Sequence, residues 1–138
     1  MNKFYRADLH VHSKYSDKPN LWALLKLNCP ESYTSPEFLY QTARENGMDY
    51  VTITDHNTIA GALEIAHLPG TFIGSEITTY FPEDGCSVHV VVLDITENIF
   101  NEILYLQKNI YELAGYLQYN GIVHFVAHAI YDLNERLK

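Results

Sequence analysis

Short apolar runs alternate with helical repeats of apolar residues along the whole chain of 138 residues. Runs rich in Val, Ile and Thr are typical of buried strands, and apolar residues at every third or fourth position are typical of one helix face. The predicted strands are 6–12, 50–54, 71–79, 88–93 and 122–127; the predicted helical segments are 21–27, 36–46, 59–66 and 97–119.

Several residues mark the ends of these elements. Ser35 is a capping residue for a helix that starts with Pro36 and ends at Gly47. Thr96 caps the long helix in the same way, and the turn at 82–85 separates the third and fourth strands. The chain therefore alternates between strands and helices with clear boundaries.

This alternation predicts an α/β architecture with a largely parallel sheet and right-handed connections. A complete barrel of eight strand and helix units needs about 250 residues. The chain is shorter, and no linker divides it, so we expect residues 1–138 to form one domain: a small open sheet or the first part of a barrel. Of these two, we favour the incomplete barrel.

Composition and charge narrow the class of protein. With 47% hydrophobic and 19% charged residues, the chain has the makeup of a globular domain. Nine basic against 17 acidic residues give a net charge of -8, which disfavours binding to duplex nucleic acid. The apolar run at 88–93 is too short to cross a membrane and the N-terminus has no signal core, so we expect a cytoplasmic protein with two reduced cysteines.

The first predicted strand carries two histidines. Because side chains alternate along a strand, Asp8, His10 and His12 are expected on one face, with Leu9 and Val11 on the other. Two imidazoles about 7 Å apart along a strand can bind one metal ion. The alternative is a polar pair on an exposed strand, but two unpaired imidazoles on a buried strand would carry a desolvation cost, which favours the metal.

Acids and a further histidine follow at the ends of the next strands. His56 comes directly after the second strand, where functional groups of α/β sheets gather, although Asp55 or Asn57 could instead cap the next helix. Asp17 is equally well a helix cap or a ligand. Glu76 lies within an apolar strand, and its two oxygens can bridge two cations; the alternative is an exposed acid at the strand end.

The remaining histidines differ in their positions. Taken alone, His89 is more typical of a hydrogen-bonded residue at a strand end than of a ligand. His124 and His128 are expected on a common face with Val126, and His128 stands at the carboxyl end of the strand. His124 is the better candidate for a structural histidine. Acids and histidines at the same ends of successive strands nevertheless predict a metal cluster.

These residues together resemble the PHP domain family, named for polymerases and histidinol phosphatase. The resemblance rests on four ordered motifs: Asp8-Leu9-His10-Val11-His12-Ser13, Ile53-Thr54-Asp55-His56, Gly74-Ser75-Glu76, and His89 with Ala127-His128. It implies a distorted TIM-like (β/α)7 barrel with up to three divalent metal ions. It also implies that His10 and His12 bind one ion, that Glu76 bridges to a second bound by His89 and His128, and that Asp17 and His56 bind the third.

The chain departs from this family pattern in two ways. Asp17 stands where many relatives have histidine, an exchange that is acceptable for a metal ligand. The late Asp-x-His motif of the family does not occur before Lys138, so two of the usual ligands are missing. Residues 79–86 are similar to PHP domains fused to a glycosyltransferase, which implies that the chain is part of a longer polypeptide.

The expected chemistry is hydrolysis of phosphate monoesters by a metal-bound hydroxide at a di- or trinuclear site. Nitrogen and oxygen ligands together suit Zn, Mn or Fe, and Asp8 and Asp55 are expected to orient the ligand imidazoles. The acidic chain points to a phosphorylated small molecule or nucleotide as substrate, with Lys14 or Lys18 as candidate phosphate contacts. The alternatives are a catalytically silent metal-binding module of a larger protein and, less favoured, a hydrolase of C–N bonds.

Overall fold

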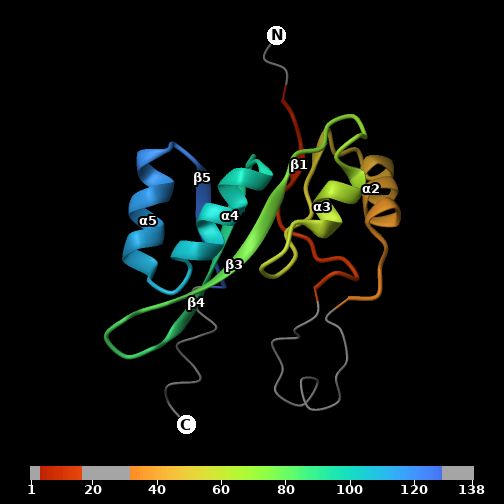
Figure 1. The fold of residues 1–138 in the computed structure, drawn as a ribbon. Coiled ribbons are helices and arrows are strands. Elements are labelled where there is room, and N and C mark those ends of the chain that lie inside the picture. The colour runs from red at the N-terminus through yellow and green to blue at the C-terminus, as the bar shows by residue number, and fades with distance from the viewer. Residues whose placement is uncertain (1–3, 17–31, 129–138) are drawn as a thin grey trace.

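The computed structural model describes residues 4–16 and 32–128 of the chain, which form two regions that meet at strand β3 (Figure 1). The predicted turns at 21–27 and the candidate ligand Asp17 lie outside the described residues. The first region contains β1 (Ala7–Asp8), α2 (Pro36–Glu45), β2 (Tyr50–Val51) and α3 (Ala60–Ile65). The second contains β3 (Gly74–Tyr80), β4 (Ser87–Leu93), α4 (Glu97–Leu106), α5 (Ile110–Tyr119) and β5 (Val123–Ala127).

The helices of the first region begin and end close to the predicted residues. The side chain of Ser35 accepts a hydrogen bond from the backbone N–H of Phe38, and Gly47, with φ of 79°, follows the end of α2. Helices α2 and α3 pack around a small core made of Ile53, Ala62 and Ile65. The predicted start and end of α2 are therefore confirmed, whereas α3 begins after Ile59 without a side-chain cap, so the alternative that Asp55 or Asn57 caps it is wrong.

The two strands of the first region are parallel, as predicted, but much shorter than predicted. The backbone N–H of Thr52 donates to the carbonyl of Asp8, and that of Thr54 donates to the carbonyl of Val11. A regular parallel ladder would advance by two residues on each strand, so the first segment contains one residue more than its partner. This bulge ends β1. The side chains after the bulge therefore point to the opposite face from the one that regular alternation from β1 would give.

The second region is an antiparallel sheet with the order β3-β4-β5, so the prediction of a largely parallel sheet is wrong for these strands. A short turn at 82–85 joins β3 to β4, which makes the pair a hairpin because parallel strands need a longer crossover. Among the described residues no closed barrel forms. Two isolated parallel bridges connect the regions: Val51 of β2 pairs with Thr71, which precedes β3, and His56, which follows β2, pairs with Glu76 of β3.

The predicted single helix at 97–119 is in fact two helices. Thr96 caps α4 as predicted, but the side chain of Asn109 accepts a hydrogen bond from the N–H of Tyr111 and starts α5 separately. The helix pair returns the chain to the end of β4, where Val123 pairs with Leu93. The break between the helices therefore explains why β5 runs antiparallel to β4.

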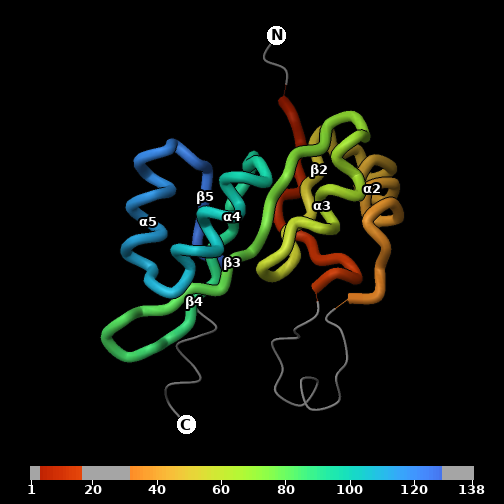
Figure 2. The backbone as a smooth tube through the Cα atoms, in the orientation of Figure 1, coloured from red at the N-terminus to blue at the C-terminus, as the bar shows by residue number. Residues whose placement is uncertain are grey.

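Helices α4 and α5 cover one face of the β3-β4-β5 sheet, and the first region lies on the other side (Figure 2). The main core packs on the helical face and includes Ile77, Val90, Val92, Ile103 and Leu117. No helix within residues 4–16 and 32–128 has the length and hydrophobicity that a membrane span requires. The opposite face of the sheet carries a small apolar cluster of Val91, Leu93 and Ala127 and, beside it, the polar side chains that face the first region.

Candidate metal centre

The centre of the candidate site is Glu76, on the sheet face that points away from α4 and α5. Glu76 pairs with Val91 and Thr78 pairs with His89, so Glu76 and His89 are diagonal neighbours on the same face. Strand alternation places Ile77 and Val90 on the other face, within the helical core. The register of the hairpin alone therefore sets the positions of Glu76 and His89 relative to each other.

The Glu76 side chain is fully buried and is surrounded by imidazoles. Its Oε2 lies 2.8 Å from Nε2 of His10 and 2.9 Å from Nε2 of His12, and its Oε1 lies 2.8 Å from Nδ1 of His89. Nδ1 of His56 lies 3.9 Å from Oε2. Burial acts to raise the pKa of the Glu76 carboxyl, but the hydrogen bonds from His10, His12 and His89 outweigh it and hold this pKa well below its usual range.

His10 and His12 reach Glu76 because of the bulge that ends β1. Their Nε2 atoms lie 3.2 Å apart, so both rings point to the same place, as predicted. Asp8 does not share their face: it lines a pocket beside α2 together with Val11. The extra residue between Asp8 and Val11 brings these two to one side and leaves the histidines on the other, so the predicted alternation of Asp8 with His10 and His12 is wrong.

The turn that follows His12 is held by a buried carboxylate. Oδ1 of Asp55 accepts the backbone N–H of Ser13 and Oδ2 accepts the Ser13 hydroxyl, both at 2.6 Å. These bonds connect the turn to the loop that carries His56. In the described structure Asp55 thus orients the backbone next to His12, whereas we had expected it to orient an imidazole directly.

The loop that carries His56 runs along β3 and is fixed to it by backbone and side-chain hydrogen bonds. The N–H of Glu76 donates to the carbonyl of Asp55, and the N–H of Asn57 donates to the carbonyl of Glu76. The Asn57 side chain accepts the N–H of Thr78, and Asn57 itself has a left-handed backbone with φ of 52°. The hydrogen bonds of Asn57 thus hold its left-handed turn, and with it His56, against the strand that carries Glu76.

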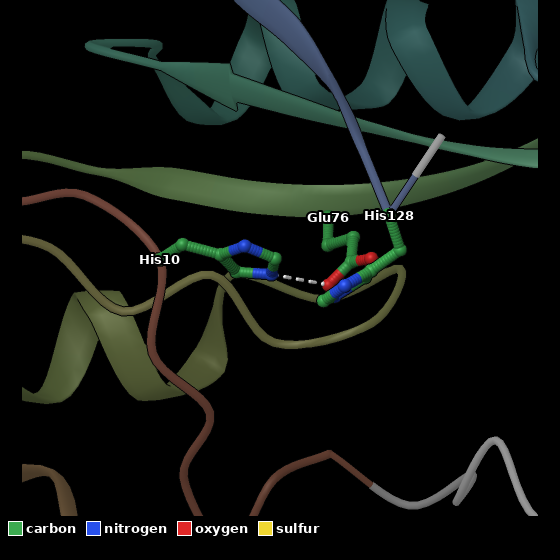
Figure 3. Close-up of side chains that lie close together, drawn as sticks. All are labelled: His10, Glu76 and His128. Atoms are coloured by element: carbon green, nitrogen blue, oxygen red, sulfur yellow. Dashed lines mark hydrogen bonds and ion pairs between the residues drawn. The ribbon is translucent and has the colours of Figure 1, made fainter. Parts of the chain in front are cut away.

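His128 enters the site from the end of β5. Its backbone is left-handed, with φ of 53°, and this turn brings its ring to the face of Glu76 and next to His10 (Figure 3). His124 stays on the helical face of the sheet, where Nδ1 lies 2.7 Å from the carbonyl oxygen of Ile122. The predicted common face of His124 and His128 is therefore wrong, because strand alternation ends at Ala127.

Two groups of donor atoms in this site are close enough to bind a metal ion, each with all its atoms within 4.8 Å of one another. One group is His10, Glu76 and His128; the other is His12, His56 and Glu76. Both contain Glu76, whose carboxylate is suited to bridge two cations.

The donor set fits a divalent transition metal. Each group offers two imidazole nitrogens and one carboxylate oxygen. Oε2 of Glu76 lies 2.8 Å from Nε2 of His10 in one group and 2.9 Å from Nε2 of His12 in the other, so one carboxylate is within reach of both groups. Imidazole and carboxylate ligands together are typical of Zn, Mn and Fe sites.

The structure groups the candidate ligands differently from the family resemblance. His128 lies with His10, and His56 lies with His12, while His89 contacts the second oxygen of Glu76. Sequence reasoning missed Ser16, whose hydroxyl contacts both His12 and His56, and the anchoring role of Asn57. Neither residue lies on a periodic pattern; only the turn propensity of Asn near a strand end gave any signal.

One basic residue in the turn is already engaged. Nζ of Lys14 lies 3.8 Å from Oε1 of Glu64 and 5.2 Å from the centre of the Tyr15 ring. The hydroxyl of Tyr15 donates to the same carboxylate at 2.6 Å, which raises the pKa of Tyr15. Lys14 thus has an acidic partner in the structure, and Lys18 lies outside the described residues.

Sequence comparison gives one related protein of unassigned function. No model of a known protein family matches the chain. An uncharacterized protein of Methanocaldococcus jannaschii is 43% identical over 79 residues, and the match covers 54% of this chain and 44% of that protein. The chain thus spans less than half the length of this relative.

Two solved structures are similar to the fold. One is an amidohydrolase from Chromobacterium violaceum, solved with bound sulfate and no metal, with a TM-score of 0.51 and 22% identity over 72% of this chain and 32% of that one. The other, from Bifidobacterium adolescentis, carries the name "putative metal-dependent phosphoesterase" and has a TM-score of 0.48 and 29% identity over 70% and 31% of the two chains. The likeness to the Chromobacterium violaceum protein shows a shared fold over part of that structure.

Proposed function

We propose that this protein is a metal-dependent hydrolase that removes phosphate from a small phosphorylated molecule. The sharing of Glu76 by two groups of candidate metal ligands carries the proposal, because one carboxylate between two cations would keep them close enough together to act on the same phosphate ester. The resemblance of the four sequence motifs to the PHP family supports it. The chain spans only part of its relatives, so the activity proposed is that of the whole protein.

Each residue of the site has a distinct role in this proposal. His10 and His128 would supply nitrogen ligands to one ion, His12 and His56 would supply nitrogen ligands to the other, and the carboxylate of Glu76 would be shared between them. His89 contacts Oε1 of Glu76 and so limits the rotation of the carboxylate. When bound, the ions would neutralise the charge on the phosphate oxygens and lower the pKa of an attacking water.

Charge limits the substrates that this site can attract. The chain has a net charge of -8, and the basic residue Lys14 is paired with Glu64. A long nucleic acid would be repelled by the acidic surface, whereas a single phosphate group can be held by the metal ions alone. We therefore propose a phosphorylated metabolite or a nucleotide as the substrate class.

The test combines metal analysis with phosphate release. We expect purified protein to bind Zn or Mn and to release phosphate from p-nitrophenyl phosphate, and we expect Glu76→Gln to lower both metal content and rate at least about 100-fold. His124→Gln is the matched control, because His124 lies on the opposite face of the sheet and should leave both unchanged. Tight metal binding by an inactive full-length protein would contradict hydrolysis and favour a metal-binding module.

A further inference from the structure

The Ser16 hydroxyl is the point where the two segments that carry His12 and His56 meet. Oγ of Ser16 lies 2.9 Å from Nδ1 of His12 and accepts the backbone N–H of His56 at 3.1 Å. Ser16 is fully buried. One hydroxyl therefore touches the ring of one candidate ligand and the backbone of another, and both ligands belong to the same group around Glu76.

The turn that contains Ser16 does not need this hydroxyl for its own shape. The backbone N–H of Ser16 donates to the carbonyl of Ser13 at 3.0 Å, and Ser13 is held by the carboxylate of Asp55. The N–H of Lys14 donates to the carbonyl of Thr34. Loss of the Ser16 side chain would leave these bonds in place, so its two contacts serve the imidazole and the adjoining loop.

A hydroxyl can serve both protonation patterns of a neutral imidazole. Without metal, Nε2–H of His12 can donate to Oε2 of Glu76 at 2.9 Å, and Nδ1 then accepts a hydrogen bond from Ser16. A metal ligand must instead present the lone pair of Nε2, so the proton moves to Nδ1 and donates to Ser16. The N–H of His56 is satisfied by the same oxygen in both cases, because a hydroxyl is one donor and two acceptor sites.

We propose that Ser16 is a positioning residue of the metal centre: its hydroxyl holds the ring of His12 with Nε2 toward Glu76, in either tautomer, and ties that ring to the His56 loop. The inference rests on the proposed metal site and adds Ser16 to it as a residue that acts on the metal through His12. Ser16 itself touches neither substrate nor metal in this scheme. Outer partners of ligand histidines typically change metal affinity about 10-fold to 100-fold.

Two measurements on the 138-residue chain test this role. The first is the Zn²⁺ dissociation constant of the wild type, Ser16→Ala and Ser16→Thr. We expect Ser16→Ala to weaken Zn²⁺ binding about 10-fold to 100-fold and Ser16→Thr, which keeps the hydroxyl, to restore it. The second is the tautomer of His12, read from the ¹⁵N chemical shifts of its ring with and without Zn²⁺; the wild type should change from protonated Nε2 to protonated Nδ1.

Ser75→Ala is the matched control for removal of a buried serine hydroxyl. Oγ of Ser75 lies 3.0 Å from the carbonyl oxygens of both Asp55 and Thr58, to which its one O–H can donate, and no contact between it and an imidazole is found among the described residues. This variant should lower stability without changing the tautomer of His12. A purely structural role for Ser16 predicts the same for Ser16→Ala.

The outcomes separate this inference from the proposed function. Wild-type affinity in Ser16→Ala, or a failure of folded Ser16→Thr to restore it, would overturn the role of Ser16 even if the protein hydrolyses phosphate esters. Zn²⁺ binding that depends on Ser16 in an inactive protein would overturn only the hydrolase. If Ser16→Ala does not fold, the test uses the tautomer of His12 in the wild type and the Zn²⁺ affinity of Ser16→Thr. A wild type in which the tautomer of His12 does not change when Zn²⁺ binds would overturn the inference.

Discussion

The two regions of this molecule place most of their candidate metal ligands in opposite ways. In the antiparallel sheet, Glu76 and His89 lie on seven-residue strands, and the register of the hairpin alone sets their spacing. In the parallel region the strands have two residues each, and His10, His12 and His56 lie on irregular segments. Those segments are held by buried side chains that bind backbone groups.

This difference indicates which parts of the site should tolerate substitution and which should not. A strand ladder spreads its free energy over many backbone hydrogen bonds, so a single side chain matters mainly through packing. An irregular segment depends on a few specific bonds, and loss of one leaves buried polar groups without a partner. We therefore expect the largest effects of substitution around Asp55 and smaller effects elsewhere in the molecule.

Removal of the buried carboxylate should have the largest effect on stability. Asp55→Ala deletes both acceptors of Ser13 and leaves its N–H buried, so we expect the free energy of unfolding to fall by about 4 kcal/mol. Urea unfolding in the presence of EDTA measures this change without metal. Glu102→Ala, an exposed acid on α4, should change it by less than about 0.5 kcal/mol; equal effects would show that Asp55 is not an anchor.

Two helical glycines, one in each region, offer a second comparison. A Cβ added to Gly61 in α3 would clash with Oδ2 of Asp55 and lie 2.7 Å from Oγ of Ser13. We expect Gly61→Ala to lower the free energy of unfolding by about 2 to 3 kcal/mol. Gly115 in α5 has open space around it, so Gly115→Ala should raise stability by about 0.5 to 1 kcal/mol. A gain of stability in both variants would contradict the close packing of Gly61 against Asp55.

The junction between the two regions should show an intermediate effect. Asn57→Ala removes the bonds to Thr78 and forces a left-handed backbone on alanine, for an expected loss of about 2 kcal/mol. Asn57→Gly removes the same bonds without the backbone strain, so its loss of unfolding free energy should be about 1 kcal/mol smaller than that of Asn57→Ala. Thermal unfolding of the two variants side by side measures this difference, and identical values would show that backbone strain does not contribute to the loss.

Acid should reveal the ionised carboxylate at the centre of the site. Because the folded-state pKa of Glu76 is depressed, its contribution to stability is present above the unfolded value of about 4.3 and is lost as the pH falls below it. Below about pH 4.3, the free energy of unfolding of the metal-free wild type should fall more steeply with decreasing pH than that of Glu76→Gln. The difference between the two slopes should be up to about 1.4 kcal/mol per pH unit. Parallel pH profiles of the two proteins would show that Glu76 is not ionised in the fold.

Much of the fold follows from local patterns in the sequence. The caps at Ser35 and Thr96 and the strand of alternating residues around Glu76 appear where they were expected, because these features depend on neighbouring residues. The direction of β5 was predicted wrongly, since it depends on one break in a helix with continuous apolar periodicity. Asn109 was the signal for that break, but a capping residue inside a helical pattern is easily overlooked.

The candidate site was predictable in its residue types and less so in its geometry. A His-x-His pair and a buried acid indicate metal chemistry by themselves, and the structure brings His10, His12 and Glu76 together. The groups that these ligands form depend on a bulge after Asp8 and on the left-handed turn at His128. Both are responses to tertiary contacts, which a single sequence does not display.

The shared carboxylate has a consequence for how the two ions would load. Because Glu76 belongs to both groups, a first cation would fix its orientation for a second and would at the same time repel that second cation, so the two affinities would be linked. This linkage would be reciprocal: each ion would change the affinity for the other by the same coupling free energy. Titration of the protein with a single metal should therefore deviate from two independent binding steps, and the sign of the deviation tells whether fixed orientation or repulsion dominates.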